Sequence, residues 1–121
     1  MSYTKMRTLI EQLHRRTQEG TLSWLETERE GIYQAAFPNY SVRLSEKPPK
    51  EPQTGGMDYW VSIYNVEGKL IDEVSDPDMR DDFEEIQINA YRLMRDLYEE
   101  ARRSAMGVQE ALSEILGQLE R

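Results

Sequence analysis

The sequence predicts an α+β fold: an N-terminal helix, a four-stranded antiparallel meander sheet, and a long or glycine-broken C-terminal helical region. Two patterns indicate this class, because apolar residues recur at helical spacing near both ends of the chain and alternate with polar residues in its middle. The chain has 121 residues, which suffices for one modest core, so we expect a single domain over 1–121. It contains no cysteine, which excludes a disulfide framework, thiolate catalysis and cysteine-ligated metal.

The first 20 residues predict the N-terminal helix, which we place at about residues 3–19, just before Gly20. Its apolar face is formed by Met6, Leu9, Ile10, Leu13 and Thr17. A connector follows, in which apolar and polar residues nearly alternate before a run of charge. We expect Trp24 in this connector to be a packing anchor of the core rather than a platform for a ligand.

The region 31–75 predicts the meander. Its four strand-like runs are 32–37, 40–45, 59–64 and 70–74. The last two runs are joined by a turn in which Asn65 comes first and Gly68 takes the left-handed position. Between the two pairs of strands, 47–57 is rich in proline, glycine and charge and is expected to be mobile. Consecutive strands joined by short or flexible connections favour antiparallel pairing.

The region 78–120 predicts the C-terminal helical region, because an apolar or small residue recurs about every 3.67 residues along it. These positions are Ile86, Ala90, Leu93, Leu97, Ala101, Ala105, Val108, Leu112, Ile115 and Leu119. One helix over this stretch would be roughly 50 Å long and would extend beyond a domain of this size. Gly107 leaves two geometries open: a continuous helix whose end contacts another chain, or a fold-back that covers this one. The unshifted apolar phase through Gly107 favours the continuous helix.

The net charge of −8 is unevenly distributed. Residues 1–75 carry nine Lys and Arg against eleven Asp and Glu, whereas residues 76–121 carry six against twelve. This balance disfavours nucleic acid and anionic membranes as partners. The acidic segment 72–85 is interpreted as a solvated surface, and its acids also suit a helix N-terminus. The alternative is an acidic decoy or inhibitor that attracts a basic, nucleic-acid-binding partner.

The sequence carries none of the familiar catalytic or metal-binding patterns. His14 is its single histidine, so it cannot form a histidine-based zinc site or complete a catalytic triad by itself. A calcium loop counted from Asp76 would place Asp81 and Gln87 where glycine and glutamate are required. We therefore expect a non-enzymatic protein without cofactor or metal. No apolar run is long enough for a membrane span or a signal-peptide core, and we expect a cytoplasmic location.

Two surfaces are candidate binding sites. The apolar stripe near the C-terminus exceeds what a small core can bury, and its members are Val108, Leu112, Ile115, Leu116 and Leu119. On the third predicted strand, Trp60 and Tyr64 share the face opposite Val61. Either helices or a dimer partner cover both faces of the sheet, or Trp60 and Tyr64 form an aromatic groove with Arg43 nearby, suited to a peptide or small planar ligand.

Four short segments of the sequence resemble those of a group of small bacterial α+β proteins of uncharacterised function. They are GTLSW at 20–24, FPNYSVR at 37–43, SIYNVEG at 62–68 and RRSAMG at 102–107. The resemblance covers nearly the whole chain and implies a bacterial, cytoplasmic domain, but it transfers no catalytic residue. We expect an interaction or regulatory module of a bacterial complex that forms a homodimer through its C-terminal helix. A ligand-binding domain and an acidic decoy are the alternatives.

Overall fold

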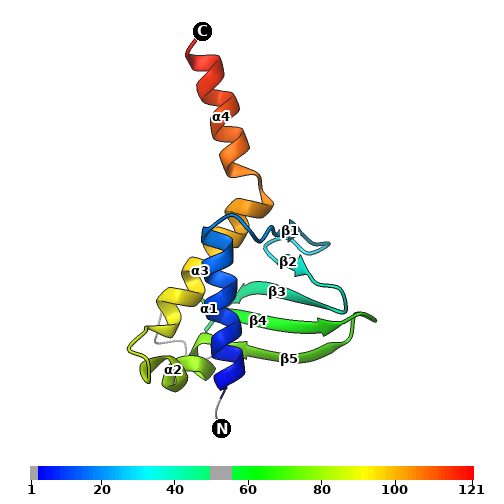
Figure 1. The fold of residues 1–121 in the computed structure, drawn as a ribbon, viewed down its shortest axis with the longest axis vertical. Helices are drawn as coiled ribbons and strands as arrows, with labels where there is room; N and C mark the ends of the chain where they lie inside the picture. The colour runs from blue at the N-terminus through cyan, green and yellow to red at the C-terminus, as the bar shows by residue number, and fades with distance from the viewer. Residues whose placement is uncertain (1–2, 50–55) are drawn as a thin grey trace.

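The computed structural model describes residues 3–49 and 56–121, and it confirms the predicted α+β class (Figure 1). Its helices are α1 (Thr4–Gln18), α2 (Asp76–Glu84), α3 (Ala90–Ala105) and α4 (Val108–Leu119). Its strands are β1 (Leu25–Glu26), β2 (Tyr33–Ala36), β3 (Tyr40–Lys47), β4 (Asp58–Asn65) and β5 (Leu70–Ser75). Within the connection that we expect to be mobile, residues 50–55 lie outside the described residues.

The sheet is an antiparallel meander with the strand order β1-β2-β3-β4-β5. It has five strands where the sequence predicts four, because the connector after α1 adds the short β1, whose Leu25 pairs with Gln34 of β2. The turn between β4 and β5 forms as predicted. Asn65 accepts hydrogen bonds through its side-chain oxygen from the backbone N–H groups of Glu67 and Lys69, and Gly68 has a φ of 81°.

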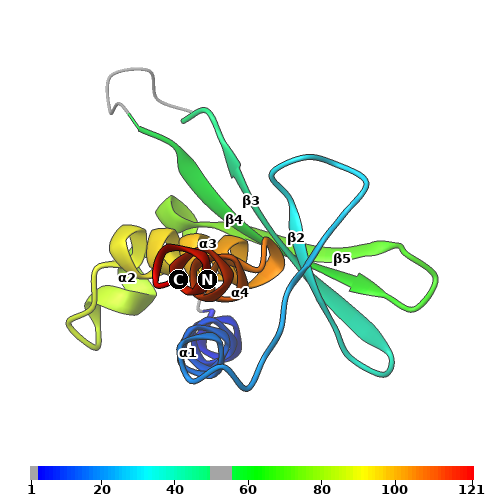
Figure 2. The same cartoon turned by 90° about the horizontal axis from the view of Figure 1, so that it is seen from above.

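All of the helices that contact the sheet lie on one of its faces (Figure 2). α3 packs on β3 and β4, α2 packs on β4 and β5, and α1 packs against α3 and α2. The alternative in which helices of this chain cover both faces of the sheet is therefore wrong. On the other side, which we call the outer face, the segment 27–32 between β1 and β2 is the cover that residues 3–49 and 56–121 supply.

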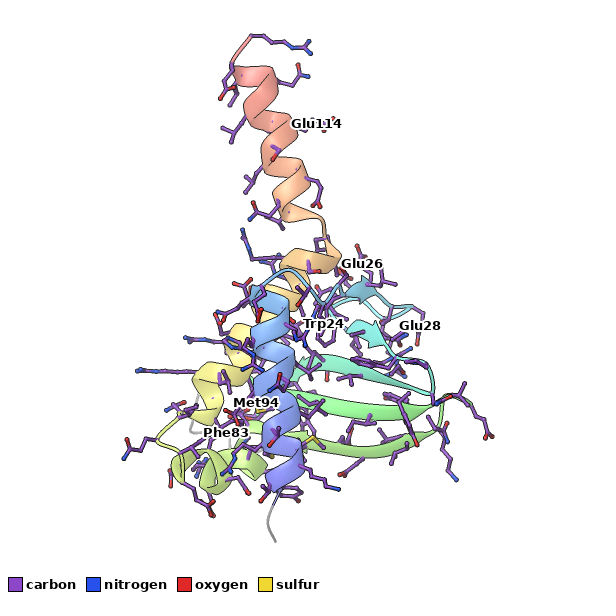
Figure 3. The ribbon with its side chains drawn as sticks, viewed as in Figure 1. Trp24, Glu26, Glu28, Phe83, Met94 and Glu114 are labelled. Atoms are coloured by element: carbon purple, nitrogen blue, oxygen red, sulfur yellow. The ribbon has the colours of Figure 1, made fainter. Side chains whose placement is uncertain are left out.

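The core lies between the helices and the inner face of the sheet. Alternate strand residues point into it, as period-two burial requires, and Val42, Leu44 and Val61 are each at most 3% exposed. Trp24, Met94 and Phe83 lie in the same layer and are fully buried (Figure 3). Three tyrosines meet across the inner face, since the ring of Tyr98 lies 5.5 Å, centroid to centroid, from those of both Tyr33 and Tyr59.

The predicted C-terminal helical region is divided into three helices. α2 begins with a capping box, in which the Ser75 hydroxyl accepts from the Asp78 N–H and the Asp78 carboxylate accepts from the Ser75 N–H. It ends before Gln87, whose φ is 59°, and Asn89 caps the start of α3. Ile86, the first member of the predicted stripe, therefore lies between helices and does not belong to the face that follows.

A second break falls at Gly107, which has a φ of 65° and a ψ of 40°. This left-handed residue ends α3, and helical structure resumes at Val108. The continuous helix that the apolar phase favours is wrong, and so is the fold-back. Instead α4 extends away from the rest of the molecule toward the C-terminus, and none of its residues is buried (Figure 1).

Trp24 joins the connector to two helices and is a packing anchor, as predicted. Its side chain is 1% exposed, and its indole N–H donates to the Thr17 hydroxyl at 2.8 Å. The Thr17 hydroxyl in turn donates to the Leu13 carbonyl oxygen at 2.6 Å. The Trp24 backbone N–H donates to the Ser104 hydroxyl at 3.1 Å, near the end of α3.

We expect Trp24→Ala to lower the free energy of unfolding by about 3–5 kcal/mol, because it removes a fully buried aromatic side chain. Thr17→Val should cost about 1–3 kcal/mol, because the buried indole N–H loses its acceptor. Urea unfolding followed by far-UV circular dichroism measures both. Leu25→Ala is the control at an exposed neighbour, with an effect within about 0.5 kcal/mol. Equal losses at positions 24 and 25 would contradict the anchor.

Burial of the tyrosines predicts loss of stability in alkali. Desolvation raises the pKa of Tyr59 to about 12 and also raises the pKa values of Tyr33 and Tyr98. Because the unfolded state loses these protons first, the stabilisation is complete below pH 10 and is lost as the pH rises from there toward 12. Tyr59→Phe should lessen this loss by up to about 1.4 kcal/mol per pH unit, measured by urea unfolding between pH 9 and 11.5. Parallel pH profiles for the two proteins would contradict the assignment.

Candidate binding surfaces

The apolar stripe of α4 is the first candidate surface. At 100° per residue its five predicted members fall on one side of the helix, and Ala111 lies beside them. Leu112, Ile115, Leu116 and Leu119 are between 45% and 75% exposed, and Val108 is half-buried. The structure thus places all five residues on one continuous apolar face, and the described part of the chain covers none of it beyond Val108.

The spacing within this stripe is that of a coiled-coil seam. Within α4, steps of four, three and four residues lead from Val108 through Leu112 and Ile115 to Leu119. The positions that flank the seam are uncharged, and they are Gln109, Ala111, Leu116 and Gln118. The glutamates of the helix lie outside these flanks. A second helix could therefore pack along the stripe without meeting a charge.

α4 also has little to stabilise it within its own chain. It has 12 residues, and an isolated helix of that length is marginal in water. Amphipathic helices gain most of their stability by packing an apolar face against another surface. Because α4 contacts the body mainly through its junction with α3, that surface is not supplied by the described residues of this chain.

The outer face of the sheet is the second candidate surface. Arg43 of β3 lies opposite Ser62 of β4, and Ser45 lies opposite Trp60. The predicted residues Arg43, Trp60 and Tyr64 all occupy this face, but they do not form one cluster. Arg43 pairs with Tyr64, whereas Trp60 pairs with Lys47. The Arg43 guanidinium lies over the Tyr64 ring at 5.3 Å from its centroid, whereas the Lys47 ammonium lies over the Trp60 ring at 4.6 Å.

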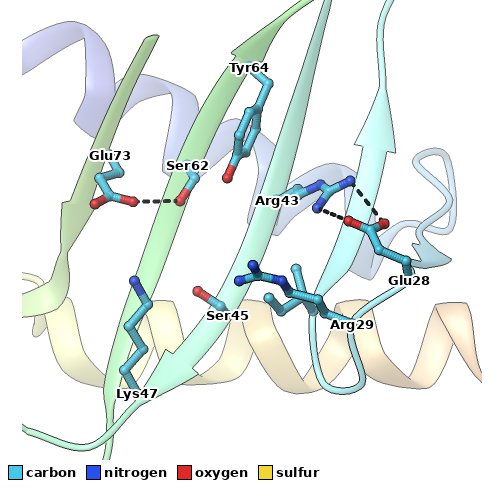
Figure 4. Close-up of a pocket in the computed structure, with 9 residues that line it drawn as sticks. Glu28, Arg29, Arg43, Ser45, Lys47, Ser62, Tyr64 and Glu73 are labelled. Atoms are coloured by element: carbon cyan, nitrogen blue, oxygen red, sulfur yellow. Dashed lines mark hydrogen bonds and ion pairs between the residues drawn. The ribbon is translucent and has the colours of Figure 1, made fainter. Parts of the chain in front are cut away.

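Arg43 fixes the segment 27–32 over the outer face. Its guanidinium donates to Gln34 Oε1 at 2.8 Å and forms a two-pronged ion pair with the Glu28 carboxylate at 3.0 and 3.3 Å (Figure 4). Donation of these hydrogen bonds by Arg43 is the main reason why the pKa of Glu28 is lowered. The predicted aromatic groove is therefore organised by an arginine and a loop carboxylate.

The segment 27–32 and the sheet enclose a cavity of about 280 Å³, which we call the outer groove. Tyr64 and Arg43 line it, whereas Trp60 does not. Further lining residues that the sequence analysis did not identify are Glu28, Arg29, Ile32, Ser45, Lys47, Ser62 and Glu73. Extending the alternation of 40–45 by two residues would have found Lys47 on the same face. No sequence signal indicates Glu28 or Arg29, because loop residues have no periodicity.

Several carboxylates of the acidic segment serve the fold. Asp76 is 7% exposed and accepts a hydrogen bond from the Tyr59 N–H at 2.8 Å, and Asp78 completes the capping box of α2. Asp82 is 6% exposed and accepts from the Tyr3 N–H at 2.9 Å. Within residues 3–49 and 56–121, no group of three or more His, Asp or Glu side chains is arranged to hold a metal ion. If the protein acts as an acidic decoy, the basic partner would bind the exposed acids around Asp76, Asp78 and Asp82.

His14 joins two helices. Its Nε2 lies 2.6 Å from the Asp96 carboxylate, so the imidazole connects α1 to α3.

Among the described helices, none has both the length and the apolar character required to cross a bilayer. The chain matches no protein-family model, no curated protein and no solved structure. The resemblance to small bacterial proteins therefore stays a prediction, and the two surfaces carry the functional argument.

The ion pair at the outer groove predicts a shifted titration. We expect the Glu28 carboxyl of the intact protein to titrate below its ordinary pKa and Arg43→Met to return that pKa upward. Because the folded-state pKa is lowered, the contact is present above the ordinary pKa and is lost as the pH falls through the lowered one. Carbon-detected NMR of the Glu28 carboxyl measures this. Arg80→Met on the exposed side of α2 is the control, and identical midpoints in wild type and Arg43→Met would contradict the assignment.

Proposed function

We propose that the protein is a non-enzymatic interaction module that self-associates through α4, acting in the bacterial cytoplasm as a homodimer or as a subunit of a larger complex. The observation that carries the proposal is the exposure of Leu112, Ile115, Leu116 and Leu119 on a helix that extends away from the core (Figure 1). Contiguous exposed apolar surface on a small domain is typical of an interaction site.

A second copy of the chain is the occupant that the stripe fits best. Alternating steps of three and four residues allow two identical helices to interdigitate along one seam. The uncharged flanking positions mean that neither copy places a charge against the other, even though residues 76–121 are strongly acidic. A basic partner would instead be attracted by charges at the flanks, which α4 lacks.

The geometry at Gly107 supports the same proposal. Because the left-handed residue directs α4 away from α3, two copies can pair along α4 while their sheets stay apart. Pairing would also bury the stripe and so stabilise a helix that is too short to be stable alone. Self-association therefore accounts for both the sequence of α4 and its direction.

Sedimentation equilibrium over a range of concentrations tests the proposal on the full chain. We expect concentration-dependent masses above 14.2 kDa, and we expect Ile115→Glu to shift the protein to monomer by placing a charge in the seam. Ser113→Glu adds the same charge on another side of α4 and is the matched control, with association retained. A wild-type monomer at all concentrations, or equal effects of the two glutamates, would refute the proposal.

A further inference from the structure

We propose that the outer groove binds a carboxylate group of a small ligand. This inference is independent of α4, because the groove lies on the sheet and is lined by residues of 28–73. Its physical basis is a set of hydrogen-bond donors that converge on one space from three parts of the chain. In an acidic protein, such a local concentration of cations and hydroxyls needs a specific explanation.

The donors come from the segment 27–32 and from two adjacent strands (Figure 4). Arg29 reaches in from the loop, Ser45 and Lys47 face the groove from β3, and Tyr64 points its hydroxyl in from β4. Arginine, lysine and hydroxyl groups together are the donors that recognise oxyanions.

Two of these groups are left without acceptors among the described residues. The Arg29 side chain forms no hydrogen bond or ion pair there, although its backbone does. Ser45 is 7% exposed, yet its hydroxyl has no hydrogen-bond partner in the same part of the chain. Because Ser45 lines the outer groove, its hydroxyl is free to donate to a ligand oxygen there.

The charges at the groove select a monoanion. Arg43 is neutralised by its ion pair with Glu28, so the cations available to a ligand are Arg29 and Lys47. Glu73 lies on the opposite wall, where it accepts a hydrogen bond from the Ser62 hydroxyl at 3.3 Å. Two cations and one carboxylate leave a single positive charge, which matches a carboxylate and disfavours a phosphate dianion.

The size of the groove restricts the rest of the ligand. A volume of about 280 Å³ lies at the lower limit of small-molecule pockets, so it accommodates a compact acid or the end of a longer one. Arg43 covers one face of the Tyr64 ring, and Trp60 does not line the groove. Recognition therefore depends on the carboxylate rather than on stacking of a planar ring.

The test titrates the full-length protein with acetate, benzoate and a short peptide, at constant ionic strength and pH 7.5. Inorganic phosphate is titrated in the same way as the alternative anion. Tryptophan emission reports binding, because the Lys47 ammonium rests on Trp60 while Trp24 is buried elsewhere. An amidated copy of the peptide distinguishes a peptide C-terminus from a free small acid. We expect saturable binding of at least one carboxylate and weaker binding of phosphate.

Charge-removing variants locate the site. Arg29→Met and Lys47→Met should each weaken carboxylate binding by at least tenfold. Because Lys47→Met also changes the surroundings of Trp60, binding to this variant is measured by amide NMR shifts rather than by tryptophan emission. Lys69→Met removes the same charge from the exposed turn between β4 and β5 and should leave binding unchanged. The inference is overturned by no saturable carboxylate binding, by tighter binding of phosphate, or by an equal effect of Lys69→Met. Because all variants keep α4 intact, failure here is distinguishable from failure of self-association.

Discussion

Coverage of the sheet by helices on one face only is the constraint on which the rest of the structure depends. α3 supplies the central contact, since the Tyr98 ring packs on Tyr33 and Tyr59 and its hydroxyl donates to the Gly31 carbonyl oxygen at 2.5 Å. Gly31 has a φ of 81°, and a Cβ there would lie 3.5 Å from the Tyr98 hydroxyl. A helix on the inner side therefore fixes the segment 27–32, whose other end Arg43 fixes from the outer side. The outer groove exists because both contacts act on one loop.

The uncovered face explains why large aromatic residues occur where alternation predicts polar ones. A single-layer cover leaves Trp60 and Tyr64 half-exposed, and the chain shields each ring with a cationic side chain from the neighbouring strand. The long stems of arginine and lysine cover apolar surface while their charges remain near water. Both faces of β4 can then carry large side chains without a second layer of helices. As a consequence, the cationic side chains on this face must keep fixed positions. The same arrangement leaves Arg29 and Lys47 available at the outer groove.

The parts of the fold that the sequence predicts are those set by local chemistry. The turn from Asn65 to Gly68 and the first helix follow from capping, turn residues and one apolar face, and the structure confirms both. Apolar periodicity fails at Ile86, because the left-handed Gln87 and the helix cap after it interrupt the backbone without interrupting the phase. For the candidate sites, alternation places Arg43, Trp60 and Tyr64 on one face, but it cannot place the loop carboxylate that pairs with Arg43. That contact is long-range and depends on how α3 positions the loop.

Gly107 shows how one backbone conformation separates two surfaces physically. A continuous helix would carry the face of α3 that packs on the core directly into α4, along one common axis. The left-handed φ of 65° turns the chain after α3 has completed its core contacts, which end with the buried Ala101 and the half-buried Ala105. The apolar phase continues in sequence, but the surface that it forms belongs to a different axis. Contacts on α4 consequently need no change in the core, and occupation of the outer groove needs no change in α4.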